Sequence, residues 1–304
     1  MQRDVNALFQ GFEDTIVETG DTNLAVLTAG SGPAVLLLHG YPQTRATWHR
    51  IAPVLAGNYS VVVPDLPGYG DSRLTGAAQG MGSKRRMARR LHEMMMKLGH
   101  DHFIVVGHDR GGRVAYRMAL DFPESVKALV SVTVVPTPEM WEGASKAFGM
   151  GAWHWFMMAQ PAPLPEKLLA ADPRFLIDLT LDKMAGGLKK LHPLALEDYR
   201  IAFDREEVRH MMCEDYRAGA TVDEADDLAD RTAGRRISAP VLLFWEEGRR
   251  YGGGREPLDI WADWADTIEG RGLRGGHLLQ ETSANEMLDL LIPFLRKNVD
   301  APKG

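Results

Sequence analysis

The stretch FIVVGHDRGGR, residues 103–113, decides the fold. Its first four residues are apolar, as in a strand buried on both faces, and a helical pattern follows at residues 114–120. Between them the order Gly-x-Asp-x-Gly matches the G-x-S-x-G turn from strand to helix, which exposes a reactive side chain. Asp109 stands where that turn has serine. A carboxylate nucleophile needs no base to deprotonate it, so this change predicts attack on a carbon that bears a leaving group.

The elements around this stretch alternate between strands and helices. Apolar runs that indicate buried strands occur at residues 34–38, 61–63, 128–132 and 240–244. Amphipathic patterns such as residues 84–98 separate them, which predicts a parallel sheet covered by helices on both sides. The alternation stops over residues 138–220, where the pattern is helical. We therefore expect a core domain of residues 1–137 and 221–304, with a helical cap domain, or lid, at 138–220 over the carboxyl ends of the strands.

Composition excludes several classes of function. The 304 residues carry a net charge of -6, and the pI is about 5.9, so nothing indicates binding to nucleic acid or to an anionic membrane. Cys213 is the single cysteine, which excludes an internal disulfide and a thiolate metal cluster. Residues 1–15 lack the long apolar segment of a signal peptide, and no apolar run approaches the ~18 residues of a membrane span. We expect a cytoplasmic protein.

Two residues are the candidate catalysts. Asp109 alone can be a helix N-cap, and a lone histidine is more often structural. However, His277 follows the last predicted strand, and a nucleophile on the turn followed by a late histidine is the order found in hydrolases. We interpret Asp109 as the nucleophile and His277 as the general base.

Several longer segments are distinctive: His39-Gly40-Tyr41-Pro42-Gln43-Thr44, residues 65–70, residues 107–113 and, in the cap, His154-Trp155, residues 159–166 and residues 213–220. With these segments the sequence resembles the α/β-hydrolases of the haloalkane dehalogenase and epoxide hydrolase group, and it is most similar to the fluoroacetate dehalogenases. The resemblance implies a mostly parallel eight-stranded sheet flanked by helices, with the lid inserted after the sixth strand.

The resemblance also implies a reaction. Asp109 would attack the α-carbon of a 2-haloacid such as fluoroacetate and release halide, and water activated by His277 would hydrolyse the aspartyl ester to the 2-hydroxy acid. No metal or other cofactor is implied, and the partner is the small haloacid. A homodimer is compatible with the sequence, which does not determine the oligomeric state or the preferred halide.

Two arginines predict an anionic substrate. Arg110 and Arg113 follow the nucleophile immediately and one helical turn later, so both can face the mouth of a pocket. Guanidinium groups bind a carboxylate in a planar, bidentate manner and would offset its repulsion from Asp109. The alternative is that either arginine lies on a solvated helix face.

Further site residues follow from the resemblance. It implies a halide site made by His154, Trp155 and Tyr216, each of which offers a polar hydrogen. The alternative for these residues is packing within the lid. The loop at Tyr41 and the backbone amide of Arg110 would stabilise negative charge when the ester is cleaved.

The chain departs from the family where an acid should orient the histidine. The position that matches the relay acid is Thr133, which can accept a hydrogen bond from an imidazole but carries no charge. Glu246 and Glu247 follow the next strand and are candidate substitutes, although both can equally be exposed loop charges. We therefore expect ester formation to survive better than ester hydrolysis.

Two other functions compete with this interpretation. An epoxide hydrolase shares the aspartate and the histidine, but it needs ring-activating tyrosines, for which Tyr216 and Tyr199 are available. A non-catalytic, ligand-binding homologue is the second alternative, suggested by Thr133.

Overall fold

The computed structural model describes residues 5–76, 80–251 and 253–299. Residues 1–4, which contribute to the expectation that the chain has no signal peptide, lie outside these ranges. No helix in the described ranges is long and apolar enough to cross a membrane.

One mixed sheet forms the centre of the molecule. Over the described residues its strands follow the order β1-β2-β4-β3-β6-β7-β8-β9, and the short β5 pairs with β2. The strands are β1 Glu13–Thr19, β2 Thr22–Ala29, β3 Ala34–Leu38, β4 Ser60–Pro64, β5 Arg73–Leu74, β6 Phe103–His108, β7 Val126–Val132, β8 Val241–Glu246 and β9 Ile268–Leu273. β2 pairs antiparallel with β1, β4 and β5, and all other pairs are parallel. The predicted mostly parallel, eight-stranded sheet is confirmed by the main path of strands.

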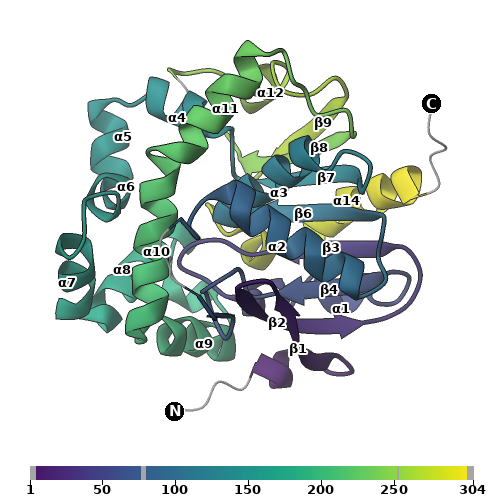
Figure 1. Cartoon of the computed structure of the whole chain (residues 1–304), viewed down its shortest axis with the longest axis horizontal. Coiled ribbons are helices and arrows are strands. Elements are labelled where there is room, and N and C mark those ends of the chain that lie inside the picture. Colours follow the sequence, from purple (N-terminus) through teal and green to yellow (C-terminus); the bar gives the residue numbers. More distant parts are fainter. Residues whose placement is uncertain (1–4, 77–79, 252, 300–304) are drawn as a thin grey trace.

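Helices cover the sheet and form the insertion. The helices outside the insertion are α1 Ala52–Leu55, α2 Lys84–Lys97, α3 Arg110–Asp121, α11 Val222–Thr232, α12 Pro257–Trp261, α13 Leu279–Thr282 and α14 Ala284–Val299. Between β7 and α11 lie α4 Thr137–Glu142, α5 Lys146–Gly151, α6 Trp153–Met158, α7 Leu164–Ala171, α8 Pro173–Ala185, α9 Pro193–Phe203 and α10 Glu206–Gly219. Figure 1 shows α5 to α9 gathered on one side of the sheet. The helical insertion therefore follows the sixth strand of the main path, as expected.

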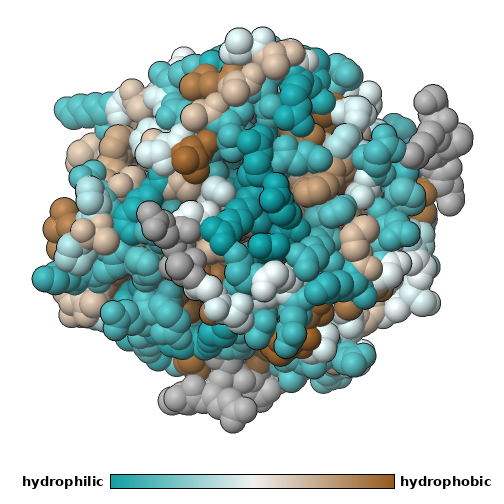
Figure 2. Space-filling model, viewed as in Figure 1, coloured by the Kyte–Doolittle hydropathy of each residue, from teal (hydrophilic) through white to brown (hydrophobic). Residues whose placement is uncertain are grey.

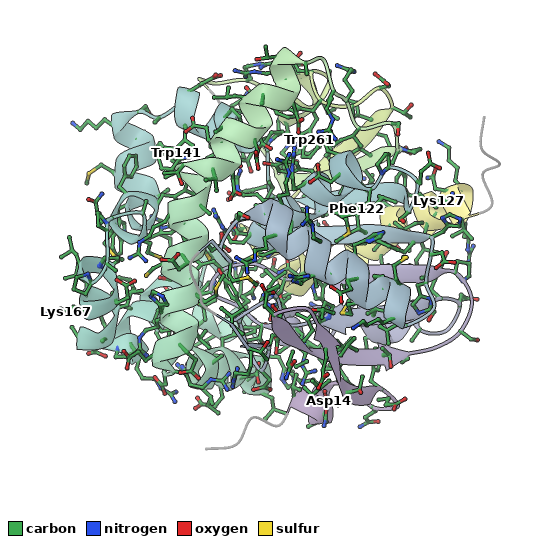
Figure 3. All side chains as sticks on the ribbon, in the orientation of Figure 1. Asp14, Phe122, Lys127, Trp141, Lys167 and Trp261 are labelled. Carbon is green, nitrogen blue, oxygen red and sulfur yellow. The ribbon has the colours of Figure 1, made fainter. Side chains whose placement is uncertain are left out.

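The core follows from the apolar runs of the sequence. Every residue of β3 and β6 is buried, as expected for central strands that have helices on both faces. Trp261, labelled in Figure 3, is fully buried, and its indole nitrogen donates to the Val134 carbonyl at 3.0 Å. The face of the molecule seen in Figure 2 is mostly hydrophilic, with apolar residues scattered over it. The burial of β6 between helices positions its carboxyl end, and therefore Asp109, which directly follows it.

Candidate active site

Asp109 lies at the sharp turn between β6 and α3. Its backbone has φ 49° and ψ -117°, a conformation that is unusual for a residue other than glycine. The turn depends on a close approach, because a Cβ at Gly111 would lie 2.2 Å from the backbone oxygen of His39. Asp109 occupies the N-cap position, but its side chain makes no capping hydrogen bond. The backbone N–H of Tyr41 instead donates to Asp109 Oδ1 at 2.9 Å.

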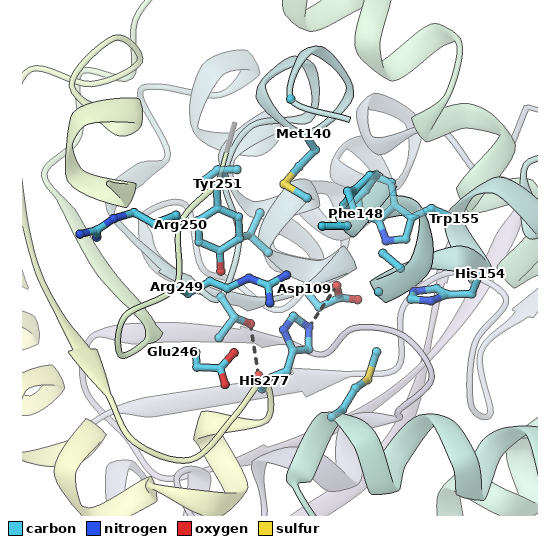
Figure 4. Close-up of a pocket in the computed structure, with 18 of the residues that line it drawn as sticks. Asp109, Met140, Phe148, His154, Trp155, Glu246, Arg249, Arg250, Tyr251 and His277 are labelled. Atoms are coloured by element: carbon cyan, nitrogen blue, oxygen red, sulfur yellow. Dashed lines mark hydrogen bonds and ion pairs between the residues drawn. The ribbon is translucent and has the colours of Figure 1, made fainter. Parts of the chain in front are cut away.

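The second carboxylate oxygen of Asp109 faces the late histidine. Oδ2 lies 3.4 Å from His277 Nε2, and Figure 4 marks this contact. Burial alone would raise the pKa of the Asp109 carboxyl, but the neighbouring imidazole and the Arg110 guanidinium hold that pKa well below its usual range. Asp109 is therefore ionised at neutral pH, as an attacking carboxylate must be.

The backbone of His277 is held by the side chains of His108, the last residue of β6, and Thr133, which directly follows β7. His108 Nε2 lies 2.9 Å from the His277 carbonyl oxygen, and Thr133 Oγ1 lies 3.2 Å from the same atom. Burial lowers the pKa of His108 to about 3, so its ring is neutral and can donate one hydrogen bond. His108 was not identified from the sequence, although its position directly before Asp109 could have indicated it.

Thr133 thus contacts the backbone of His277, and the described residues contain no hydrogen bond from Thr133 to the imidazole. Its backbone has φ 58°, an outlier for a β-branched residue. Of the two candidate substitute acids, Glu246 lines the same cavity as His277. Glu247 is exposed and accepts from Arg274 Nε at 2.6 Å. Of these two acids, Glu246 therefore shares the cavity with His277, whereas Glu247 does not.

A cavity of about 750 Å³ has Asp109 in its wall. Among the predicted site residues, its walls include Asp109, His277, Arg113, Thr133, His154, Trp155 and Glu246. Arg110, Tyr41, Tyr216 and Glu247 do not line it. Arg249 and Tyr251 do line it and were not identified from the sequence, because their loop carries no motif beyond its position after β8. Figure 4 shows these two residues on one side of Asp109, with His154 and Trp155 on the other.

The two predicted arginines have different surroundings. Arg110 is fully buried, and its Nε donates to Asp215 Oδ1 on α10 at 2.7 Å. Arg113 faces the cavity, and the described residues offer it no carboxylate partner. Its Nη1 donates to Thr137 Oγ1 at 2.9 Å, and its Cζ lies 4.9 Å from the centroid of the Trp155 ring. Arg110 is therefore paired with Asp215, whereas Arg113 forms no ion pair among the described residues and contacts Thr137 and Trp155 instead.

Aromatic side chains from the lid pack against the turn at Tyr41. The Tyr41 ring stacks on His154 with centroids 5.4 Å apart and meets Tyr216 edge-on at 5.3 Å. Tyr216 also meets the ring of Trp155 edge-on at 5.7 Å. Burial lowers the pKa of His154 to about 4, so its imidazole is neutral near pH 7. The hydroxyl of Tyr216 is buried and has no hydrogen-bond partner within the described part of the chain.

The described residues contain no group of three or more His, Cys, Asp or Glu side chains arranged to hold a metal ion. Cys213 is buried, and burial raises the pKa of its thiol to about 12, so the thiol is unreactive near neutral pH.

Comparison with known proteins gives a consistent set of similarities. Residues 33–247 match the family described as alpha/beta hydrolase fold. A fluoroacetate dehalogenase from Burkholderia sp is 39% identical over 291 residues, which cover 95% of each chain. A threonine-to-aspartate mutant of a proposed epoxide hydrolase from Pseudomonas aeruginosa is 49% identical, with a TM-score of 0.93 over 95% of this chain and 98% of that one. The same type of mutant, solved with bound MFA, has a TM-score of 0.92 over 95% of this chain and 97% of that one.

Proposed function

Because the chain belongs to the α/β-hydrolase family, we propose that it hydrolyses the carbon–halogen bond of 2-haloacids such as fluoroacetate through an aspartyl ester. One arrangement carries this proposal. Asp109 Oδ2 lies 3.4 Å from His277 Nε2, and the Arg113 guanidinium faces the same cavity without an ion pair to any acid in the described part of the chain. A nucleophile, a base and a carboxylate binder thus converge on one space. The fluoroacetate dehalogenase relative supports the same substrate class.

In the first step Asp109 attacks the carbon that bears the halogen. Oδ1 is held by the Tyr41 N–H, which leaves Oδ2 to form the new C–O bond as the C–X bond breaks. The electron pair of the broken bond leaves with the halide. Arg113 would bind the substrate carboxylate and reduce its repulsion from Asp109. His154 and Trp155 line the cavity and would donate hydrogen bonds to the halide, with Tyr216 behind them.

In the second step water attacks the carbonyl carbon of the Asp109 ester. His277 Nε2 takes a proton from the water, and the negative charge that develops on Oδ1 is stabilised by the Tyr41 N–H. The backbone N–H of Arg110, adjacent to the ester, is the second donor that we propose. Collapse of the intermediate releases the 2-hydroxy acid, which carries Oδ2 and takes the proton from His277.

We also propose that Glu246 provides the negative charge that Thr133 lacks. Both Glu246 and His277 line the cavity, and Figure 4 draws the two side chains beside each other. The described residues contain no direct hydrogen bond between them, so Glu246 would act through the field it exerts on the imidazolium or through a bridging water. We therefore expect a slower second step than in an enzyme whose acid contacts the imidazole directly.

The proposed function is tested by measuring halide release and intact protein mass together. Wild type should release fluoride from fluoroacetate and bromide from bromoacetate, whereas Asp109→Asn should release neither. His277→Gln should release up to one halide per protein molecule and gain the mass of one carboxymethyl group, because the ester forms but is not hydrolysed. Asp101→Asn is the matched control, since Asp101 is exposed. Equal halide release from wild type and Asp109→Asn would remove Asp109 from the mechanism.

Epoxide hydrolysis is the second candidate, favoured by the Pseudomonas aeruginosa relative and by Tyr251 in the cavity wall. Tyr199, one of the predicted ring-activating residues, donates to Glu281 Oε1 at 2.8 Å and does not line the cavity. An uncharged epoxide would also leave the charge of Arg113 uncompensated. Turnover of styrene oxide without halide release from any haloacid would support this candidate over dehalogenation.

A further inference from the structure

The cavity is much larger than a two-carbon haloacid. Fluoroacetate has five heavy atoms and would occupy roughly 150 Å³ if each took the ~30 Å³ share of a water molecule in the liquid. The cavity measures about 750 Å³ and is lined on the Trp155 side by apolar residues such as Met140 and Phe148. A substrate that fills this space must be longer than a haloacetate.

The charges in the cavity wall favour an additional negative charge on the substrate. Four basic and two acidic side chains line it, within a chain of net charge -6; they are Arg113, Lys183, Arg249, Arg250, Asp109 and Glu246. Arg250 forms an ion pair with Glu256, and Lys183 Nζ donates to the Gly151 carbonyl at 2.6 Å. Arg113 and Arg249 have no acidic partner among the described residues.

The backbone of Arg249 is held directly after the end of β8. Gly248 has φ 77°, a conformation that favours glycine, and the backbone N–H of Arg249 donates to the Glu246 carbonyl at 2.9 Å. Tyr251 and Arg255 exchange two backbone hydrogen bonds, of 3.0 and 2.8 Å. The Arg249 Cζ lies 5.7 Å from the centroid of the Tyr251 ring. In Figure 4, Arg250 extends away from Asp109.

The two guanidinium groups that lack an ion pair among the described residues lie against different aromatic rings of the cavity wall. Arg113 is near Trp155, whereas Arg249 is near Tyr251. We propose that the preferred substrate is a 2-haloacid with a second anionic group, a carboxylate or a phosphate, at the far end of its chain. Arg113 binds the carboxylate next to the reacting carbon, and Arg249 binds the distal anion. This inference rests on the proposed function for the reaction, but it concerns binding and can be tested separately.

The test measures the affinity of unreactive ligands by calorimetry, so it does not require bond cleavage. Succinate, glutarate and adipate are each compared with the monoacid of equal length, and 3-phosphonopropionate tests a distal phosphate. The measured quantity is the ratio of diacid to monoacid affinity. In wild type at least one diacid should bind about 10- to 100-fold more tightly than its monoacid, as expected for a charge-assisted contact. Arg249→Gln should abolish most of this ratio, and Arg249→Lys should restore part of it.

Arg250→Gln is the matched control, because it removes the adjacent arginine, which is already paired with Glu256. It should keep the wild-type ratio. A wild-type ratio near one, or a ratio that Arg249→Gln leaves unchanged, would overturn the proposal, as would loss of the ratio in Lys183→Gln alone. Tighter binding of the phosphonate than of every diacid would assign the distal group as phosphate, and weaker binding would assign it as carboxylate.

Halide release then separates this proposal from the proposed function. Wild type should release bromide from 2-bromoglutarate with a kcat/KM at least 10-fold above that for 2-bromopentanoate. A diacid preference in binding without halide release from any haloacid would refute dehalogenation but support the role of Arg249. Halide release without a diacid preference would refute the role of Arg249 but support dehalogenation.

Discussion

Replacing Asp215 with asparagine should destabilise the protein strongly. Asp215 is fully buried on α10 and accepts hydrogen bonds from Arg110 at 2.7 Å and from the Tyr69 hydroxyl at 2.8 Å. It also pairs with the buried ammonium of Lys84. Asparagine keeps the shape but removes the charge, and its NH₂ group would face donors. Lys84 retains Asp223 at 3.2 Å, whereas Arg110 has no other ion pair within the described part of the chain.

The magnitude follows from the burial of these charges. At an effective dielectric constant of 20, two unit charges 4 Å apart attract by about 4 kcal/mol. Removing one partner of a buried ion pair costs about 3–5 kcal/mol, because the other charge stays desolvated. With an unfolding entropy of about 2.1 cal/mol/K per residue over 304 residues, that loss lowers Tm by roughly 5–8 °C. Although burial opposes it, the neighbouring cations lower the pKa of Asp215, so its contribution is present at neutral pH and is lost only under acidic conditions.

The assay is thermal unfolding followed by near-UV circular dichroism at neutral pH. Glu214→Gln is the matched control, since Glu214 pairs with Arg217 at 2.6 Å near the surface, and removing such a pair costs about 1 kcal/mol or less. Its Tm should fall by less than about 2 °C. An Asp215→Asn protein that melts within the range of the Glu214→Gln control would refute the view that Asp215 neutralises the buried cations.

Three further predictions concern the site and the pH dependence of stability. Glu246→Gln should slow ester hydrolysis and increase the amount of aspartyl-ester adduct seen by mass spectrometry. Glu247→Gln, at an exposed position, should change neither quantity. Equal amounts of adduct in the two variants would contradict the proposed role of Glu246. Thr133→Asp should accelerate hydrolysis of the ester by about 10-fold or more in single-turnover measurements, because it adds a negative charge near His277. Aspartate also tolerates the positive φ at this position better than threonine. An equal gain in Thr133→Asn would show that the charge is not the cause. Burial raises the pKa of Glu281 to about 7 from 4.5, so the folded state binds more protons in this window and the free energy of unfolding should fall by up to about 3 kcal/mol as pH rises through it. Urea titrations at pH 5 and pH 7.5 should show this loss in wild type and not in Glu281→Gln, and parallel pH dependence in both would exclude Glu281 as its source.

The fold could be predicted from the sequence because its main signals are local. Apolar runs identified the central strands, and the glycines at 107 and 111 identified the turn that carries Asp109. The order of Asp109 and His277 along the chain was enough to expect them together, since carboxyl ends of parallel strands meet at one edge of a sheet. Their separation of 3.4 Å agrees with that expectation, although their catalytic roles remain predictions.

Side-chain pairing between distant segments could not be predicted in the same way. Helical spacing indicated that Arg110 and Arg113 can face the same direction, but the identity of the acid on α10 that engages Arg110 depends on how the lid packs. Likewise, the sequence did not distinguish Glu246 from Glu247. Their positions differ, because Glu246 is the last residue of β8 at the carboxyl edge of the sheet and Glu247 lies beyond it. That difference could have favoured Glu246 as the acid nearer the site.

The hydrogen bond from Tyr41 N–H to Asp109 Oδ1 makes the two carboxylate oxygens inequivalent. In the proposed reaction each product carries away Oδ2, and an oxygen from water takes its place while Oδ1 stays anchored. The carboxylate therefore stores one solvent oxygen and delivers it in the following cycle. In water enriched in heavy oxygen, the first product made by each protein molecule would be unlabelled and the second fully labelled. A carboxylate free to rotate would instead label about half of the second product.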